Sequence, residues 1–458
     1  MSSPRHIGDT PQGGPVQAFY VRKGTARRPP IAHGDGIYLW DAAGRRYLDA
    51  SSGPVVSNLG HGNRRVLEAM RAQAEQVTFA YPGLFESEAN VALADLVCKL
   101  AGPGLDRAFF VSGGSEATEA AIKLARQYAL AIGQPGRVTV IGREPGYHGG
   151  TLGALAVTGD QHAEEVFGPL MRTMPKVPAP LSYRIPPGHS VESYAHACAR
   201  ALEDEIVRQG PTTVLAFIME PIGGLASGAS VAPAAYYEEV RAICDRHGVL
   251  LIYDEVMSGA GRTGTFLAAD HWPSVRPDLV TLAKGIAAGY TPFGAVLAPD
   301  HVVDAVVEAG GFLHGHTYFT NPLSCAIAHA VVGEMMDRDL IGNAARMGLL
   351  LRERLDALAA RSRVIGDVRG KGLLMAIELV ADKESKRMLP PELVAPARLG
   401  AFALEEGLAL YSRRTSKGTF GDWVMITPPL IIDAAQVDEL VGLLERAIIA
   451  FELSLSAS

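Results

Sequence analysis

The sequence predicts an α/β protein in which a mostly parallel central sheet forms a large domain and a smaller α+β unit follows it. Three observations lead to this prediction. Short apolar runs alternate with longer amphipathic segments between about residues 108 and 298, which is typical of strands joined by helical crossovers. The alternation stops near residue 325, so we place the large domain at residues 60–325. The 458 residues, of which 48% are hydrophobic, exceed one ordinary domain and can bury a large core.

Charge and cysteine usage narrow the class of protein. The net charge of −7 argues against a nucleic acid or an anionic membrane as partner. The four cysteines, Cys98, Cys198, Cys244 and Cys325, form no Cys-x-x-Cys pair, which favours a reducing compartment. The first residues lack the apolar stretch of a secretory signal, and no uncharged apolar run is long enough to span a bilayer. We therefore expect a cytoplasmic location.

The elements follow from periodicity and turn residues. Residues 1–35 are rich in Gly, Pro, Arg and Ser, and we expect them to run over a surface. Two short strands and two helices are predicted next, at 36–40, 45–49, 64–75 and 86–100. The core strands are predicted at 108–111, 137–141, 213–219, 249–253, 279–283 and 294–298. Helices are predicted between them at 116–132, 193–209 and 234–247.

The pattern after residue 325 is different. A long helical region, 326–361, leads to a strand-like segment at 368–379. A helix at 395–406 and short strands at 409–412 and 423–427 come next. A last helix starts at Asp433, which has the spacing of a capping box with Gln436.

Lys284 is the first candidate for chemistry, because it follows the buried apolar run 279–283 directly. Open α/β sheets bind their ligands at the carboxyl ends of their strands. A lysine there has little water around its amine, so its pKa should fall, and a neutral amine is a nucleophile toward carbonyl carbons. The alternative is a lysine that reaches out to solvent from the end of a strand.

Two other strand ends carry groups that suit a flat, phosphorylated ligand. Ser112–Glu119 opens a helix, where glycines and free N–H groups make a phosphate site from Gly114 and Ser115. The alternative is an ordinary helix cap made by Ser115. Tyr147 lies in a glycine-flanked loop and can stack on a flat ring, although a partly buried loop tyrosine would look the same.

Carboxylates end two further strands. Asp254 and Glu255 follow a buried apolar run, and period two makes Asp254 point the same way as Val256 while Glu255 points away. Glu220 ends the 213–219 strand in the same manner. Asp254 and Lys284 would lie one crossover apart on the same edge of the sheet. A phosphate site, an aromatic ring, a buried acid and an imine-forming lysine are together what pyridoxal phosphate needs, since the acid keeps the pyridine nitrogen protonated.

Competing motifs are weaker. Residues 259–264 match Gly-x-Gly-x-x-Gly, but the segment after them is short and a poor helix former, so a dinucleotide site is not expected. His314 and His316 could be a metal pair, but no third ligand accompanies them at a suitable spacing, so no metal is expected. The sequence contains neither Gly-x-Ser-x-Gly nor a P-loop.

Several motifs, in order, resemble the class III (ω-amino acid:pyruvate-type) aminotransferases, which are pyridoxal-phosphate enzymes of fold type I. The resemblance covers about residues 36–444 and rests on 112–126, 254–264, 282–285, 294–296, 316–322 and 368–373. It implies a large domain with a mostly parallel sheet and a small domain built from residues 1–59 and 326–458. It also implies a homodimer or a dimer of two dimers, with active sites at the subunit interface.

The resemblance implies a role for each matching position. Lys284 would bind the cofactor pyridoxal 5'-phosphate as a Schiff base and would be the catalytic residue. The other cofactor-binding positions would be Gly114, Ser115, Tyr147, His148, Glu220, Asp254, Val256 and, from the neighbouring subunit, Thr317. Asp254 would contact the pyridinium nitrogen, and Tyr147 and Val256 would cover the two faces of the ring.

The substrate contacts and the reaction follow with less detail. Arg413 or Arg414 would bind a substrate carboxylate, because a planar guanidinium suits bidentate contact. Two solvated surface arginines are the alternative. Ser52 and Tyr81 lie in segments expected to line the pocket. The expected reaction moves an amino group from an amine or ω-amino acid to a 2-oxo acid, with pyruvate as the expected acceptor. An aminomutase, decarboxylase or racemase would share the same cofactor residues, and a cofactor-binding protein without catalysis is a further alternative.

Overall fold

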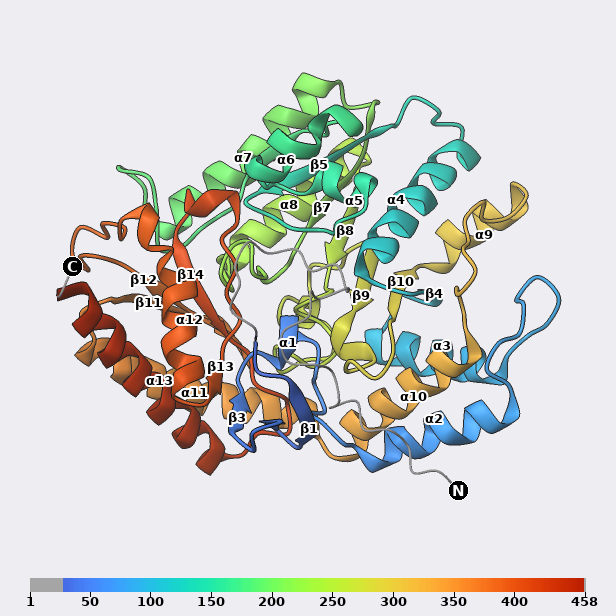
Figure 1. The fold of residues 1–458 in the computed structure, drawn as a ribbon. Coiled ribbons are helices and arrows are strands. Elements are labelled where there is room, and N and C mark those ends of the chain that lie inside the picture. Colours follow the sequence, from blue (N-terminus) through green and yellow to red (C-terminus); the bar gives the residue numbers. More distant parts are fainter. Residues whose placement is uncertain (1–27, 457–458) are drawn as a thin grey trace.

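A computed structural model describes residues 28–456, and these residues form sheets of seven, four and three strands (Figure 1). The predicted α/β class with a mostly parallel central sheet is confirmed. Residues 1–27, for which a surface path was expected, lie outside the described part. Within residues 28–456, no helix combines the length and apolarity that crossing a bilayer requires.

The seven-stranded sheet carries the candidate site at one edge. In spatial order its strands are β4 (Arg107–Val111), β10 (Gly294–Ala298), β9 (Leu279–Ala283), β8 (Leu250–Asp254), β7 (Val214–Met219), β5 (Thr139–Glu144) and β6 (Lys176–Pro178). Neighbouring strands are parallel except that β10 runs antiparallel to both β4 and β9. Residues 284–293, which connect β9 to β10, are too few for a parallel crossover, which needs about a dozen residues or more.

Helices cover both faces of this sheet (Figure 1). On one face lie α4 (Gly114–Ala131) and α9 (Asp300–Glu308), and on the other lie α7 (Val191–Gln209) and α8 (Ala234–His247). The side chains of β8 alternate accordingly. Ile252 packs in the cluster that contains the apolar face of α4, whereas Leu251 and Tyr253 pack with α7 and α8.

A group of helices packs beside the sheet, and one of them corrects a prediction. The group comprises α2 (Arg64–Gln76), α3 (Glu88–Ala101), α10 (Pro322–Asp337) and α11 (Leu340–Arg361). The helical region predicted at 326–361 is two helices, because Asp339 adopts a left-handed conformation with φ of 49°. A left-handed residue ends the run of helical hydrogen bonds, and aspartate is one of the few non-glycine residues that tolerates it.

Two smaller sheets contain strands that the periodicity did not resolve. One has the order β1 (Ile31–Asp35), β2 (Tyr38–Asp41), β3 (Arg46–Asp49) and β13 (Leu408–Ala409), with β13 parallel to β3. The other consists of β11 (Ile365–Lys371), β12 (Leu374–Leu379) and β14 (Asp422–Ile426). The segment predicted as one strand at 368–379 is a hairpin that turns at Gly372, where φ is 57°. β1 was not predicted, because most of its residues are exposed and its sequence lacks alternation.

The remaining elements are short or close the chain. The long helices α12 (Ala395–Glu405) and α13 (Ala434–Ser456) pack together. Asp433 Oδ1 accepts from the Gln436 N–H at 2.9 Å and Gln436 Oε1 accepts from the Asp433 N–H at 3.0 Å, so the predicted capping box is confirmed. The short elements are α1 (Ser52–Val55), α5 (Leu152–Val157), α6 (Gln161–Phe167) and the 3₁₀ turns Gly168–Leu170, Ala268–His271, Lys284–Ile286, Pro391–Leu393 and Ser416–Gly418.

Arg262 joins distant parts of the chain at one buried point. Its guanidinium donates to the Leu373 and Pro428 carbonyls at 3.2 and 2.5 Å and to Asn58 Oδ1 at 2.6 Å. Burial lowers the pKa of Arg262 to about 9, against the opposing charge of Asp49. The glycine-rich turn 259–264, which formally matches a dinucleotide motif, thus presents its arginine to the protein itself.

Candidate active site

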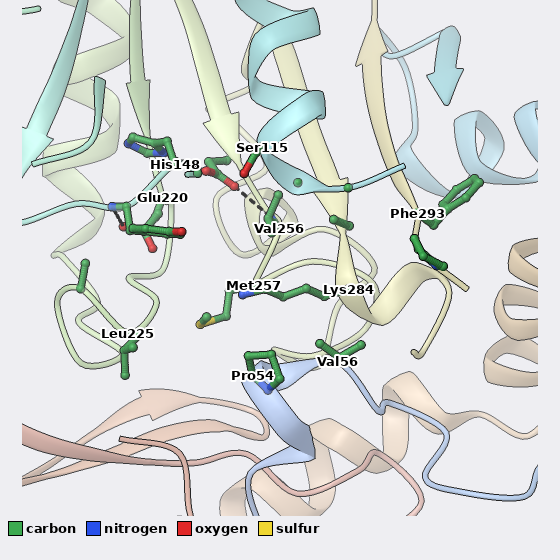
Figure 2. A pocket seen from close by; sticks show the side chains of 18 of the residues that line it. Pro54, Val56, Ser115, His148, Glu220, Leu225, Val256, Met257, Lys284 and Phe293 are labelled. Atoms are coloured by element: carbon green, nitrogen blue, oxygen red, sulfur yellow. Dashed lines mark hydrogen bonds and ion pairs between the residues drawn. The ribbon is translucent and has the colours of Figure 1, made fainter. Parts of the chain in front are cut away.

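A cavity of about 380 Å³ lies at the carboxyl ends of β8 and β9, next to the first turn of α4. The segment after β3 contributes Pro54 and Val56, and the loop before β14 contributes Tyr411, Arg413 and Thr415. The strand ends, the segment after β3 and the loop before β14 therefore enclose one space. In Figure 2 the strand ends lie above Lys284, and Pro54 and Val56 lie below it.

Lys284 projects into the middle of this space. It follows β9 directly and has a positive φ of 50°, a conformation that costs a non-glycine residue roughly 1–2 kcal/mol. Figure 2 shows its side chain crossing the cavity, with Val256 on one side and Pro54 and Val56 on the other. Burial lowers the pKa of the amine to about 8, although the charges of Asp254 and Glu220 oppose this shift. The lowered pKa expected from the sequence is confirmed, and a substantial fraction of the amine is neutral near pH 8.

Asp254 ends β8, the strand beside Lys284, and is 4% exposed. Its Oδ2 lies 2.8 Å from His148 Nδ1, and its Oδ1 accepts from the Val256 N–H at 3.0 Å. Val256 lines the same cavity, so the two side chains point the same way, as predicted. Glu255 points away, and its carboxylate accepts from the N–H groups of Ala268 and Ala269.

The start of α4 forms another wall of the cavity. Gly113 and Gly114 precede Ser115 here, and no side chain caps the helix. A Cβ on Gly114 would lie 3.0 Å from Val256 Cγ1 and 3.2 Å from its Cγ2, so glycine permits this close approach. Ser115 Oγ accepts from the Gly150 N–H at 2.9 Å, which leaves its O–H free to donate into the cavity. The first N–H groups of a helix lack intrahelical partners, so this end can hold an anion.

Tyr147 and His148 follow β5 in a loop that is held on two sides. Glu220 Oε2 accepts from the Tyr147 N–H at 3.3 Å, and Glu220 Oε1 accepts from the Gly224 N–H at 2.8 Å. The Thr118 hydroxyl of α4 donates to the His148 carbonyl at 2.8 Å. Burial raises the pKa of Glu220, and the charge of His148 opposes this shift. Glu220 therefore fixes the backbone that carries Tyr147.

The structure brings some of the predicted substrate residues to the cavity and not others, and Thr317, expected to act in a second subunit, also lies outside it. Arg413 lines the cavity, and its Cζ lies 5.4 Å from the centre of the Tyr147 ring. Arg414 points elsewhere and donates twice to the Asp422 carboxylate, at 2.7 Å each. The Ser52 hydroxyl is buried against the Thr427 carbonyl at 2.6 Å, outside the lining. Tyr81 and Thr317 are exposed and do not line the cavity of their own chain, and their roles stay predictions.

Some lining residues were not expected from the sequence. These are Leu225, Met257, Thr291, Pro292, Phe293 and Tyr411. Phe293 precedes β10 and so lies at the amino end of a strand, whereas the site was expected at carboxyl ends. Because β10 is antiparallel, its amino end lies at the same edge as the carboxyl ends of its neighbours. The short connection between β9 and β10 is the feature of the sequence that indicates the antiparallel direction of β10.

Comparison with known proteins agrees with this arrangement. Residues 20–448 match the family described as Aminotransferase class-III. An uncharacterized aminotransferase, YodT, of Bacillus subtilis is 38% identical over 430 residues, which cover 93% of this chain and 96% of that protein. A diaminobutyrate–2-oxoglutarate transaminase of Halomonas elongata is 34% identical and covers 91% of this chain and 89% of its own.

Solved structures give the same result. A thermostable (S)-enantioselective omega-transaminase from Thermomicrobium roseum superposes with a TM-score of 0.85 at 38% identity, covering 93% of each chain. An amine transaminase from an uncultivated Pseudomonas species, in a PLP-bound form, gives 0.88 at 36% identity and covers 95% of this chain and 99% of its own.

The fold and the cavity define a pyridoxal-phosphate-dependent transferase of fold type I. The chain belongs to the class III aminotransferase family and is a transaminase whose cofactor is pyridoxal 5'-phosphate. The cavity fits this cofactor, because a helix start that glycine brings close to Val256 faces a buried acid and a partly neutral lysine amine. When bound, the cofactor supplies a ring that absorbs the electrons released at the substrate carbon.

Proposed function

We propose that this transaminase takes the amino group from amines or ω-amino acids and passes it to a 2-oxo acid, with pyruvate as the acceptor. One observation carries the proposal: the same cavity contains the Lys284 amine and the Arg413 guanidinium. The guanidinium suits the carboxylate of a 2-oxo acid or an ω-amino acid. Apolar walls at Val56, Leu225 and Phe293 suit the uncharged part of an amine.

Each of the main residues of the cavity has a separate proposed role. Lys284 Nζ would hold the cofactor, and this amine, partly neutral because burial lowers its pKa, would move a proton at the substrate carbon. The Asp254 carboxylate, held by His148, would keep the cofactor's ring nitrogen protonated. Tyr147 and Val256 would pack against the cofactor's ring, and the start of α4 at Gly114 and Ser115 would hold its phosphate. Glu220 acts on the position of Tyr147 through its backbone contact.

A panel of substrates tests the proposal. The holoenzyme is offered neutral amines, ω-amino acids and α-amino acids as donors, each with pyruvate, 2-oxoglutarate or glyoxylate. We expect amines and ω-amino acids to change the cofactor absorbance and to consume pyruvate in a one-to-one ratio, and Lys284→Ala to abolish turnover. Product formation without consumption of an acceptor would instead indicate an aminomutase, decarboxylase or racemase. Absence of any donor-dependent absorbance change would indicate a binding protein without catalysis.

We further propose that the enzyme is a homodimer in which Thr317 reaches the phosphate site of the partner. Large apolar side chains near Thr317 support this arrangement: Leu313 is 88% and Tyr318 63% exposed in the single chain. Phe79 is 40% exposed and its ring packs edge-on against Tyr318 at 6.1 Å. Exposed apolar surface of this kind is typical of an interface. The cytoplasmic location stays a prediction from the cysteine pattern.

A further inference from the structure

Asp160 lies beside the candidate active site and has no part in the roles described above. It follows Gly159, which pairs in an antiparallel bridge with Gly146, so the segment that carries Asp160 lies next to the segment that carries Tyr147. Asp160 is 5% exposed although it is charged. A buried carboxylate needs partners, and its two oxygens have different ones.

One oxygen of Asp160 fastens the loop that carries Arg413. Oδ1 accepts from the Ser416 N–H at 3.1 Å and from the His162 N–H at 3.2 Å. Ser416 and Lys417 both have positive φ, 47° and 54°, which is an unfavourable conformation for non-glycine residues. Such a backbone persists only where its surroundings hold it, so the contact with Asp160 helps to fix the loop.

The other oxygen of Asp160 faces the cavity arginine. Oδ2 lies 4.0 Å from Arg413 Nη2, and the Arg413 side chain is 48% exposed. Arg413 therefore already has a counter-charge in the chain itself. Its neighbour Arg414 is committed to Asp422 on the other side of the loop, so Arg413 alone of these two arginines lines the cavity.

We propose that Asp160 is a positioning residue that sets how strongly the cavity prefers substrates with a carboxylate over those without one. A bound carboxylate must draw Arg413 away from Asp160, or share it, and the two negative charges then repel each other. An amine that lacks a carboxylate meets neither cost, because it does not bind Arg413. The inference rests on the proposed function, because it takes Arg413 as the contact for the substrate carboxylate.

The variant Asp160→Asn separates the charge from the loop contact. The side-chain oxygen of asparagine can still accept from Ser416 and His162, so the loop keeps its anchor. The holoenzyme variant should bind butanoate, a carboxylate without an amino group, about two- to fivefold more tightly in calorimetry, as expected for a half-exposed ion pair. Its KM for carboxylate-bearing substrates should fall by the same factor, whereas its affinity for butylamine stays unchanged. The gain should shrink at high salt.

Two further variants serve as controls. Glu165→Gln removes another acid of the same region, one that pairs with Lys417 of the loop, and should leave butanoate affinity unchanged. Arg413→Ala should abolish the effect of Asp160→Asn. Three results would overturn the inference: Asp160→Asn does not tighten butanoate binding, it changes butanoate and butylamine equally, or Arg413→Ala leaves butanoate affinity unaltered. Because butanoate binding needs no turnover, a failure of transamination in the substrate panel remains a separate result.

Discussion

Lys284 combines two unfavourable features, a positive φ and a buried amine, at the position where the proposed function needs a neutral nucleophile. Strain and desolvation of this kind persist where the surrounding structure holds them. Here the surroundings are Val256 on one side and the segment after β3 on the other, both lining the cavity. The lowered pKa of Lys284 therefore depends on its burial between these two parts of the chain.

Burial of the Lys284 amine should lower the free energy of unfolding of the cofactor-free protein, and the size of this loss should depend on pH. The folded pKa of Lys284 is about 8 and the ordinary value is 10.5, so between these values the unfolded chain binds more protons. The cost is fully present below pH 8 and disappears as the pH rises toward 10.5. Lys284→Met should raise the thermal midpoint of the cofactor-free protein at pH 7, and the gain over wild type should fade across that window. A gain that stays constant with pH would contradict the lowered pKa.

At the scale of residues, the sequence predicts which chemical groups the site contains better than it predicts where loop side chains point. Lys284 was identified because it directly follows a buried apolar run, and Asp254 and Val256 were placed on one side because side chains alternate along a strand. Arg413 and Arg414 could not be told apart. Their directions depend on a loop with two left-handed residues, Ser416 and Lys417, and neither residue type indicates that conformation.

At the scale of elements, α4 does more than offer its first turn to an anion. Its polar side chains also fasten the segment after β5. Glu119 Oε1 accepts from the Thr151 hydroxyl at 2.7 Å and from the N–H groups of Gly153 and Ala154 at 2.9 and 3.2 Å. Together with the contact from Thr118 to the His148 carbonyl, this fixes the loop of Tyr147 to the helix.

Removing this attachment should weaken the protein measurably. Glu119→Ala leaves the helix start at α5 without its acceptor and should lower the free energy of unfolding by about 1–3 kcal/mol in urea titrations. Glu75→Ala is the matched control, since Glu75 forms an exposed ion pair with Arg71 one turn away, and its loss should change the free energy of unfolding by less than about 0.5 kcal/mol. Equal effects of the two substitutions would show that Glu119 does not hold the segment.

The order and type of most elements could be predicted, because strands and helices alternate with clear periods. The direction of β10 could not, since periodicity is the same for both directions and only the length of the connection distinguishes them. The break between α10 and α11 was also missed, because Asp339 occurs in an otherwise helical pattern.

At the scale of the whole molecule, the proposed dimer has a direct test. Leu313→Asp places a charge on the apolar surface beside Thr317 and should shift the protein toward monomer in light scattering, with loss of cofactor retention. Leu349→Asp is the control, because Leu349 is 76% exposed on α11, outside the segment that carries Leu313 and Thr317. A dimer that survives Leu313→Asp and loses no cofactor would contradict the proposed interface.

The pairing of β3 with β13 has a consequence for how the protein is made. Leu48 and Leu408 are partners in this sheet, so a strand that leaves the ribosome early waits for one that leaves near the end of synthesis. Until then β3 presents an open edge, which is a template for pairing with other chains. Chains cut short before β13 therefore carry an unprotected edge, and we expect such fragments to aggregate even where the seven-stranded sheet is complete.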